Sequence, residues 1–429
     1  MSEFVPEGWS QAKVGSLSLK VGSGVTPRGG SKAYFTSGVK FIRSQNVHFT
    51  GLKLNDVVYI SQDIHDSMLG SQLQDNDVLL NITGASIGRC TFVPNSFGAA
   101  NVNQHVCIIR PNEKIKSAYL SQWFSSDSGQ NAIMRYQAGG NREGLNFQQI
   151  RSMIVTLPPL PEQQKIAAIL TSVDEVIEKT QAQINKLKDL KTGMMQELLT
   201  RGVGVDGKPH TEFKDSPVGR IPKGWEVDKL SSIINVIESG WSPQCESEPA
   251  QVGEWCILKT TAVSWDGFNY SANKKLPTSL EPRINIQVNV EDILITRAGP
   301  ADRVGVVVYV NSVPKKVMLS DKIIRLRVNN TCNAEFISLW LSSTFAQHFM
   351  SSRVSGLASS QTNISQAILA SIPCIIPSLV EQEMIASSIR SINERIDIVN
   401  AKFSTSKQLK KALMQDLLTG KVRVKVDSE

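Results

Sequence analysis

The chain has 429 residues, of which 41% are hydrophobic and 20% charged, so it can bury sizeable cores and should divide into two or three domains. Its 46 lysines and arginines against 39 aspartates and glutamates give a net charge of +7, which fits a nucleic-acid partner but is too thinly spread to establish one. The first ten residues lack the pattern of a signal peptide, and no apolar run is long enough to span a bilayer. We therefore expect a cytoplasmic protein without a membrane partner.

The cysteines and histidines do not form a metal-binding pattern. No CxxC pair occurs, and none of the five histidines stands at zinc-ligand spacing. We expect reduced, partly buried thiols and no metal. The cysteines are Cys90, Cys107, Cys245, Cys256, Cys332 and Cys374.

One long repeat runs through the whole chain. Pro6-Glu7-Gly8-Trp9 returns as Pro222-Lys223-Gly224-Trp225, and Gly24-Val25-Thr26-Pro27 as Gly240-Trp241-Ser242-Pro243, both at a shift of 216 positions. The shift is 217 between Trp123 and Trp340, and 219 between MMQELLT from Met194 and LMQDLLT from Leu413. Because the shift changes so little, few insertions separate the copies, and two copies imply two equivalent tasks.

The first part of each copy has a β-rich pattern. Short apolar runs such as VKFIRSQNV, DVLLNITG and HVCIIRP alternate with turns, and WCILKTTAV, DILITRAG and KIIRLRV mirror them in the second copy. One helix is predicted in each copy after these strands, over Ser117 to about Tyr136 and over Ala334 to about Met350. Trp123 and Trp340 lie at helical spacing within them, which favours a core role over base stacking.

The second part of each copy is a long helix with a heptad seam, in which apolar residues recur in steps of four and three. Each helix should run for about 38 residues, or about 57 Å. Ser378 and Glu381 have the spacing of a capping box, whereas Pro159 and Pro161 preset the first turn of the first helix. The predicted seam residues are Ile166, Leu170, Val173, Ile177, Ile184 and Leu187 in the first helix, and Ile385, Ile389, Ile392, Ile396, Val399 and Phe403 in the second.

So narrow a seam needs a partner of matching length, and the other copy supplies one. A pseudo-two-fold axis would make the helices antiparallel and hold one globular domain at each end. Since a turn of duplex DNA spans about 34 to 36 Å, such a spacer could hold the two globular domains on two separate half-sites of one DNA target. The alternative left open by the pattern is a coiled coil that merely dimerises a two-domain protein.

The motifs resemble those of one family. They are the helix entry LPPLPEQQKIAAIL from Leu157, the helix exits LLTRG from Leu198 and LLTG from Leu417, and the GxTP element at Gly24. Together they resemble the specificity subunits of type I restriction-modification systems, over essentially the whole chain. The second copy departs mildly, with PSLVEQ from Pro377 at the helix entry and Ser242 in the GxTP position.

The resemblance implies an α+β fold in which two repeated β-rich target-recognition domains are separated by an antiparallel two-helix coiled coil. It also implies a bipartite double-stranded DNA target, two adenine-N6 methyltransferase subunits that use S-adenosylmethionine and dock on the helices, and ATP-driven translocase and endonuclease subunits that carry ATP and Mg. The expected divisions are recognition domains over 1–157 and 220–375, spacer helices over 158–200 and 376–420, a linker over 201–219 and a tail over 421–429.

The chain lacks catalytic motifs of its own. Pro158-Pro159 is flanked by leucines and is not the loop that an amino-methyltransferase needs, and no GxxxxGK[ST] phosphate loop occurs. We expect no catalysis and no bound cofactor in this chain. Two rival classes are a tandem scaffold that organises proteins, which would show no salt-sensitive DNA affinity, and a fused methyltransferase-nuclease, which the missing motifs argue against.

Candidate DNA-binding residues follow from donor chemistry and from the repeat. Cations at equivalent positions in both copies suit phosphate contacts, namely Arg43 with Lys259 and His105 with Lys322. Polar loop residues that differ between the copies suit base readout, although they are also ordinary turn residues. These are Arg28, Lys32, Tyr34, Arg89, Asn141 and Arg142 in the first copy, and Gln244, Arg297, Arg303, Ser359, Ser360 and Gln361 in the second. Gly24, Gly84, Gly139 and Gly140 are predicted to shape the backbone.

Overall fold

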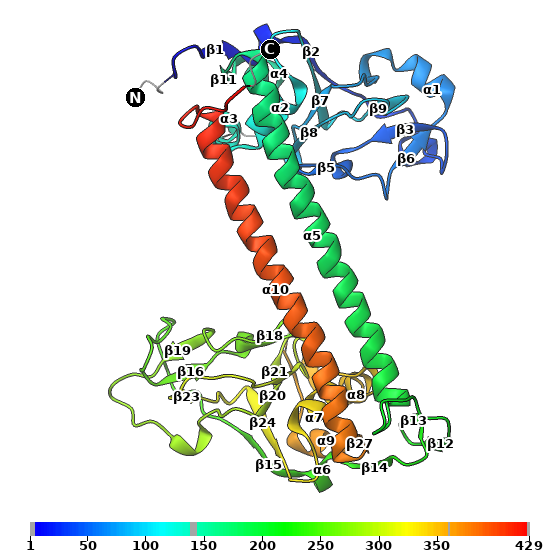
Figure 1. The fold of residues 1–429 in the computed structure, drawn as a ribbon, viewed down its shortest axis with the longest axis vertical. Helices are drawn as coiled ribbons and strands as arrows, with labels where there is room; N and C mark the ends of the chain where they lie inside the picture. The colour runs from blue at the N-terminus through cyan, green and yellow to red at the C-terminus, as the bar shows by residue number, and fades with distance from the viewer. Residues whose placement is uncertain (1–4, 138–143, 359–360, 427–429) are drawn as a thin grey trace. The chain divides into compact units, whose positions relative to one another are not determined.

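The chain folds into two compact units. The computed structural model describes residues 5–137, 144–358 and 361–426. Unit 1 comprises Met1–Ile184 and Ile398–Glu429, and unit 2 comprises Asn185–Asp397. Each long helix is therefore shared, because its two ends pack in different units (Figure 1). This division cuts across the predicted one, in which each spacer helix was a segment of its own.

Unit 1 is built on a four-stranded antiparallel sheet in the order β2-β10-β7-β8. Beside it lies a three-stranded sheet, β6-β3-β9, in which β3 and β9 are parallel, and two strand pairs, β1-β11 and β4-β5. The strands are β1 (Ser10–Lys13), β2 (Ser18–Ser23), β3 (Val39–Ile42), β4 (Val47–His48), β5 (Gly51–Leu52), β6 (Val58–Ile60), β7 (Val78–Asn81), β8 (Cys90–Phe92), β9 (Ala100–Val102), β10 (Val106–Pro111) and β11 (Ile154–Leu157).

Unit 2 repeats this topology strand for strand. Its main sheet has the order β15-β24-β20-β22, its second sheet is β19-β16-β23 with β16 parallel to β23, and its pairs are β14-β27 and β17-β18. It adds a small sheet, β21-β26-β25, and the hairpin β12-β13, which crosses the predicted end of the linker at residue 219. The strands are β12 (Phe213–Ser216), β13 (Gly219–Pro222), β14 (Glu226–Lys229), β15 (Ile234–Ser239), β16 (Cys256–Leu258), β17 (Val263–Ser264), β18 (Gly267–Phe268), β19 (Asn273–Lys275), β20 (Ile293–Thr296), β21 (Ala298–Gly299), β22 (Val307–Tyr309), β23 (Val317–Met318), β24 (Ile323–Val328), β25 (Ser355–Ala358), β26 (Gln361–Asn363) and β27 (Pro373–Ile376).

Short helices cover the sheets, and two long helices follow the domains. The helices are α1 (Gln62–Ser67), α2 (Ser117–Ser125), α3 (Asp127–Gln137), α4 (Phe147–Ser152), α5 (Leu160–Arg201), α6 (Leu230–Ile233), α7 (Ala334–Leu341), α8 (Thr344–Ser351), α9 (Gln366–Ala370) and α10 (Leu379–Leu418). The long helices α5 and α10 have 42 and 40 residues, slightly more than the pattern predicted.

The prediction of a single helix after the strands of each copy is wrong, because a serine divides this segment into two helices in both copies. Ser126 adopts extended backbone between α2 and α3, and its hydroxyl accepts a hydrogen bond from Gly129 N at 3.2 Å. In the second copy the hydroxyl of Ser343 accepts from Ala346 N and starts α8. A serine that caps a new helix competes with continuation of the old one, which periodicity alone does not reveal.

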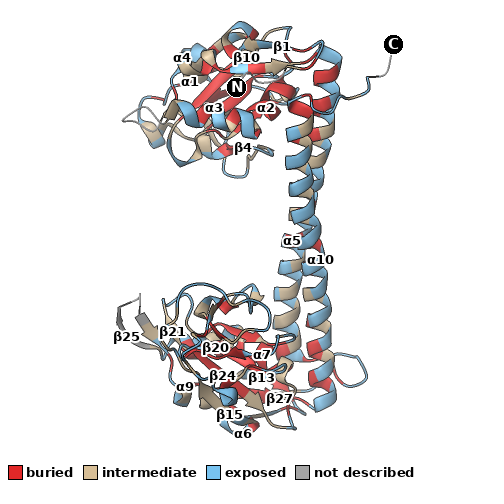
Figure 2. Ribbon diagram, turned by 90° about the vertical axis from the view of Figure 1, so that its left-hand side faces the viewer, coloured by how far each residue is buried: buried red, intermediate tan, exposed pale blue. Residues whose placement is uncertain are grey.

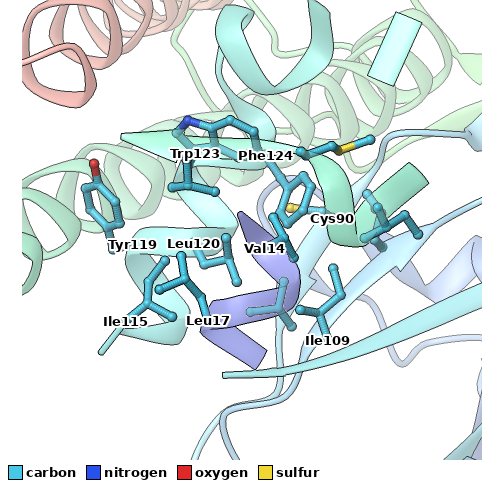
Figure 3. Packing of buried hydrophobic residues seen from close by; sticks show 14 of the residues in the cluster. Val14, Leu17, Cys90, Ile109, Ile115, Tyr119, Leu120, Trp123 and Phe124 are labelled. Carbon is cyan, nitrogen blue, oxygen red and sulfur yellow. The ribbon is translucent and has the colours of Figure 1, made fainter. Parts of the chain in front are cut away.

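The apolar cores lie between the main sheets and the first of these helices. Trp123 packs with Phe124, Leu120 and Val14 in unit 1, and the core includes Cys90 (Figure 3). Trp123 and its repeat mate Trp340 are both 3% exposed, which confirms the predicted core role. In each unit the buried residues concentrate on the strands and on α2 or α7 (Figure 2). All six cysteines are unpaired thiols, and burial raises the pKa of Cys90 to about 11.

The helices α5 and α10 run antiparallel within each unit. In unit 1 the start of α5 meets the end of α10, since Ile166 and Leu170 share a core with Leu417. In unit 2 the end of α5 meets the start of α10, since Leu199 shares a core with Ile385. Of the predicted seam residues, Val173, Leu187, Ile392 and Phe403 are half-buried and the other eight are buried.

A polar cluster interrupts the seam in unit 1. Asp174 is 9% exposed, and its carboxylate accepts hydrogen bonds from Lys410 Nζ at 2.6 Å and from Gln122 Nε2 at 2.9 Å. In unit 2 the repeat mate of Lys410 is Lys191. Its pKa is lowered, because the effect of burial exceeds the opposing effect of the nearby charge of Asp397. A buried charged contact favours one register of a helix pair over others.

Each long helix begins with a buried glutamate that binds the domain's first tryptophan. Glu162 is 6% exposed and accepts hydrogen bonds from Trp9 Nε1 at 3.2 Å and from Arg423 Nε at 2.9 Å. Glu381 is 3% exposed and accepts from Trp225 Nε1 at 2.9 Å.

The hydrogen-bonded site around Glu381 is completed by the segment that follows α5. The backbone amides of Val203 and Gly204 donate to Glu381 Oε1 at 3.1 and 3.2 Å, and His210 Nε2 lies 2.9 Å from the same oxygen. The predicted capping box is therefore half right. Ser378 Oγ accepts from Glu381 N at 3.3 Å, but the carboxylate of Glu381 is used by these other partners.

We predict that Lys410→Met destabilises the chain by about 3 kcal/mol, because it leaves Asp174 buried without its charge partner. The neighbouring Lys411→Met is the matched control, since Lys411 is 72% exposed and only 3.6 Å from the exposed Asp127, and it should cost less than about 1 kcal/mol. Urea unfolding of the two variants measures the difference. Equal effects would contradict a structural role for the buried pair.

We also predict that Glu381→Gln lowers stability by about 2 kcal/mol at neutral pH, through weaker hydrogen bonds to its donors. Burial acts to raise the pKa of Glu381, but the hydrogen bonds from Trp225, His210, Val203 and Gly204 outweigh it and hold the pKa below 4.5. A lowered carboxyl pKa contributes stability above the unfolded pKa that is lost as the pH falls through the folded one. The difference between wild type and variant should therefore shrink below about pH 4.5 in urea titrations followed by tryptophan fluorescence.

The control for this prediction is Glu212→Gln, in which the replaced carboxylate is 71% exposed and pairs with Lys223. It should change stability by less than about 1 kcal/mol at any pH. A loss of stability in Glu381→Gln that does not change with pH would show that the charge of Glu381 does not contribute to the stability of this site.

Candidate nucleic-acid interface

Several loops leave the main sheet of unit 1 from one end. The pairings Ser23 with Cys107, Val106 with Asn81, and Leu80 with Cys90 place the end of β2, the start of β10 and the β7-β8 turn together. The loops over 24–38, 82–89 and 103–105 therefore emerge side by side. They carry most of the candidates predicted in the first copy, namely Arg28, Lys32, Tyr34, Arg89 and His105.

A glycine is required where the first of these loops crosses the sheet. A Cβ on Gly24 would lie 1.7 Å from the carbonyl oxygen of Val102, and one on Gly240 would lie 2.0 Å from that of Leu319. The loop after β2 and the loop after β15 therefore pass equally close to the neighbouring strand. This bears out the backbone-shaping role predicted for Gly24, and Gly84 has a left-handed φ of 69°.

His105 ties two of these loops together. Its Nδ1 lies 2.6 Å from Thr83 Oγ1, its Nε2 lies 3.0 Å from Gln104 Nε2, and its carbonyl accepts from Ile82 N at 3.0 Å. Thr26 in turn contacts the Gln104 side chain. With both ring nitrogens engaged, His105 is better placed to position loops than to bind a phosphate directly.

Arg43 is also anchored inside the domain. Its guanidinium lies 5.8 Å from the Tyr34 ring centroid, and its Nη2 donates to the carbonyl of Asp56 at 3.0 Å. Its Nε is buried without a partner among the described residues. Its repeat mate Lys259 is similarly held, since Lys259 Nζ donates to the carbonyl of Ser247 at 3.1 Å. Phosphate contact by this pair remains a prediction.

Unit 2 gathers its candidates at the same end of its own sheet. Arg297 N donates to the carbonyl of Lys322 at 2.8 Å, and Arg297 Nη1 lies 3.5 Å from Ser239 Oγ. Ser242, the mate of Thr26, donates to Asp321. The loop after β15, the turn after β20 and the loop before β24 are thus joined as in unit 1.

Among the predicted DNA-binding residues, four cations and one amide are exposed and remain available for a ligand. Their side chains make no hydrogen bond or ion pair with the part of the chain that the structure describes. They are Arg28 and Lys32 in unit 1 and Arg303 and Lys322 in unit 2, together with the exposed amide of Gln244. Arg89 is half-buried and lies directly before β8.

Some predicted residues lie outside the described ones. These are Asn141, Arg142, Gly139, Gly140, Ser359 and Ser360. Gln361 belongs to β26, and only its backbone placement is described.

One pair of exposed aromatic residues was not among the predicted candidates. Phe49 and Trp265 stand 216 positions apart at the tips of the β4-β5 and β17-β18 hairpins, and they are 41% and 60% exposed. The signal that could have found them is the same repeat, since Gly51 and Gly267 of these hairpins already align.

The site offers recognition chemistry. No group of three histidine, cysteine or acidic side chains able to hold a metal occurs among residues 5–137, 144–358 and 361–426. No helix in that same part of the chain is long and apolar enough to cross a membrane. What the loops present is arginine, lysine and amide donors, which suit phosphates and base edges.

Sequence comparison identifies the repeat. A family model described as the type I restriction modification DNA specificity domain matches twice, over residues 7–189 and 222–405. The EcoEI specificity subunit of Escherichia coli is 38% identical over 190 residues, which cover 44% of this chain and 32% of that protein. The putative MjaX specificity subunit of Methanocaldococcus jannaschii is 25% identical over 98% of this chain and 95% of its own length.

Solved structures share the fold. The S subunit of a type I restriction-modification system from M. genitalium superposes with a TM-score of 0.62 at 14% identity, over 97% of both chains. A chain from a structural study of assembly and conformational transition in the type I R-M system gives a TM-score of 0.54 at 16% identity, over 98% of this chain and all of that one. With both copies matched to the family model, the chain belongs to the type I restriction-modification specificity subunits, the non-catalytic DNA-recognition components of these systems.

Proposed function

We propose that each unit of this chain reads one half of a bipartite DNA target through the loops at the end of its main sheet. The observation that carries the proposal is the equivalence of these two sites. The same three loops meet at the same sheet end in both units, around Gly24 and Gly240, yet they carry different exposed side chains. Two equivalent loop scaffolds that carry different exposed side chains suit two half-sites of different sequence.

The exposed cations supply the positioning contacts in this proposal. Arg28 and Lys32 in unit 1, and Arg303 and Lys322 in unit 2, are free to meet phosphates or guanine edges. Residues held by internal hydrogen bonds, such as His105 and Arg43, act as supports for the loops.

The paired helices set the distance between half-sites in this proposal, and they dock two methyltransferase subunits. Those subunits supply S-adenosylmethionine chemistry, and translocase and endonuclease subunits supply ATP and Mg. A cytoplasmic location is part of the same proposal. Support comes from the buried Asp174–Lys410 contact, which suits a helix pair of defined register, and from the family to which the chain belongs.

We predict that the gene for this chain determines an adenine-methylation motif made of two short sequences around an unread spacer. Sequencing the methyladenine of a strain with and without the gene should show that motif appear and disappear. The chain alone should bind the motif poorly, and addition of its methyltransferase subunits should restore binding. A complex that assembles but methylates no defined motif would contradict the proposal.

We predict further that Lys322→Gln weakens binding of the assembled complex to all duplexes alike and lowers the slope of log K against log salt by about one, because one phosphate contact is lost. Lys223→Gln is the control, since Lys223 is also a surface lysine of unit 2 but lies directly after the β12-β13 hairpin, where it pairs with Glu212. Affinity measured between low and physiological salt distinguishes them. An affinity that does not depend on salt would favour a protein-binding scaffold.

A further inference from the structure

Each unit exposes one aromatic ring at the tip of a tight hairpin. The tips join Val47–His48 to Gly51–Leu52 and Val263–Ser264 to Gly267–Phe268. Phe49 and Trp265 occupy the same tip position, and more than a third of each side chain is exposed. A single exposed aromatic residue is ordinary on a protein surface, but here the same hairpin position carries one in both copies.

The backbone holds each tip in place. Gly51 and Gly267 have φ values of +127° and +119°, which residues other than glycine rarely adopt. Behind the tips, Lys53 N donates to the carbonyl of Asn46 and Asn269 N donates to that of Ala262, both at 2.9 Å. The aromatic rings therefore project from short, well-connected turns.

Trp265 is fixed against the turn that carries Arg303. Its Nε1 lies 3.4 Å from the carbonyl oxygen of Asp302. That turn is anchored to β20, because Thr296 donates its hydroxyl to the carbonyl of Arg303 and Val306 N donates to the Thr296 hydroxyl at 3.0 Å. The indole and the exposed guanidinium of Arg303 thus belong to one surface.

The tip in unit 1 also has cations beside it. Thr50, next to Phe49, lines an open pocket together with Lys407 and Lys411 of α10 and with Ser126 at the α2-α3 break. Lys411 is 72% exposed, and its nearest acid is Asp127 at 3.6 Å. An apolar ring with exposed lysines nearby suits a ligand that has both flat aromatic groups and negative charge.

We propose that Phe49 and Trp265 are DNA-contacting residues, and that each packs its ring against a base step or thymine methyl of the half-site read by its own unit. This rests on the proposed function, which it deepens. The Trp265 N–H is already directed at Asp302, and phenylalanine has no donor, so both rings act through apolar contact and not through hydrogen bonds.

The test uses the chain assembled with its methyltransferase subunits and duplexes that contain the methylated motif. Trp265→Ala and Phe49→Ala should each weaken specific binding by about tenfold or more, as expected for loss of one aromatic contact with a base. Trp265→Phe should retain most of the affinity, because the apolar face is kept. Val252→Ala and Leu19→Ala, which alter side chains that are 102% and 73% exposed elsewhere in units 2 and 1, should bind like wild type.

A double-mutant cycle separates contact from general damage. Scrambling the half-site read by unit 2 should cost Trp265→Ala less than it costs wild type, whereas scrambling the other half-site should cost both equally. Phe49→Ala should show the reverse pattern. Coupling of each tip to one half-site supports the proposal.

Three results would overturn it: affinities equal to those of the two control variants, equal losses on specific and scrambled DNA, or impaired assembly with the methyltransferase subunits and unchanged DNA binding. The last result would make the tips a protein contact. Failure of the proposed function itself would look different, because wild type would then have no preferred bipartite sequence.

Discussion

Glu162 and Glu381 each carry a carboxylate into a site almost closed to water, and such a charge is tolerated only with several donors. The donors come from distant parts of the chain. The indole N–H of Trp9 or Trp225 comes from the start of the domain, and the rest come from the segment that follows the other long helix. One side chain therefore joins three parts of each unit, and it ties the start of one long helix to the segment that follows the other.

The two junctions use different chemistry for the same purpose. In unit 1 the charge of Glu162 is met by Arg423, whose guanidinium also lies 5.7 Å from the Trp9 ring centroid. In unit 2 the same task falls to two backbone amides and His210, supplied by the segment after α5. The tail after α10 and the segment after α5 are thus equivalent structural parts, although their sequences have little in common.

The reading loops follow a similar division between scaffold and variable residues. Gly24 and Gly240 make the same close approach to a neighbouring strand, and the loops around them are tied by internal hydrogen bonds. Such contacts hold the loop backbones, so exposed side chains can change without disturbing the fold. Trp265 fits this scheme, since its anchor on Asp302 is a backbone carbonyl.

The sequence by itself determined the repeat, the β-rich character of each half, the long helices with their heptad seam and the family, because all of these are periodic or collinear signals. Tertiary structure alone decided that Ser126 and Ser343 break a predicted helix, that Glu381 leaves its capping role for Trp225, and that His105 has both ring nitrogens occupied. It also decided that Phe49 and Trp265 are exposed while Trp123 and Trp340 are buried. These outcomes depend on which partners arrive from far along the chain, and a hydrogen bond or a buried face between distant residues leaves no periodic trace in either segment.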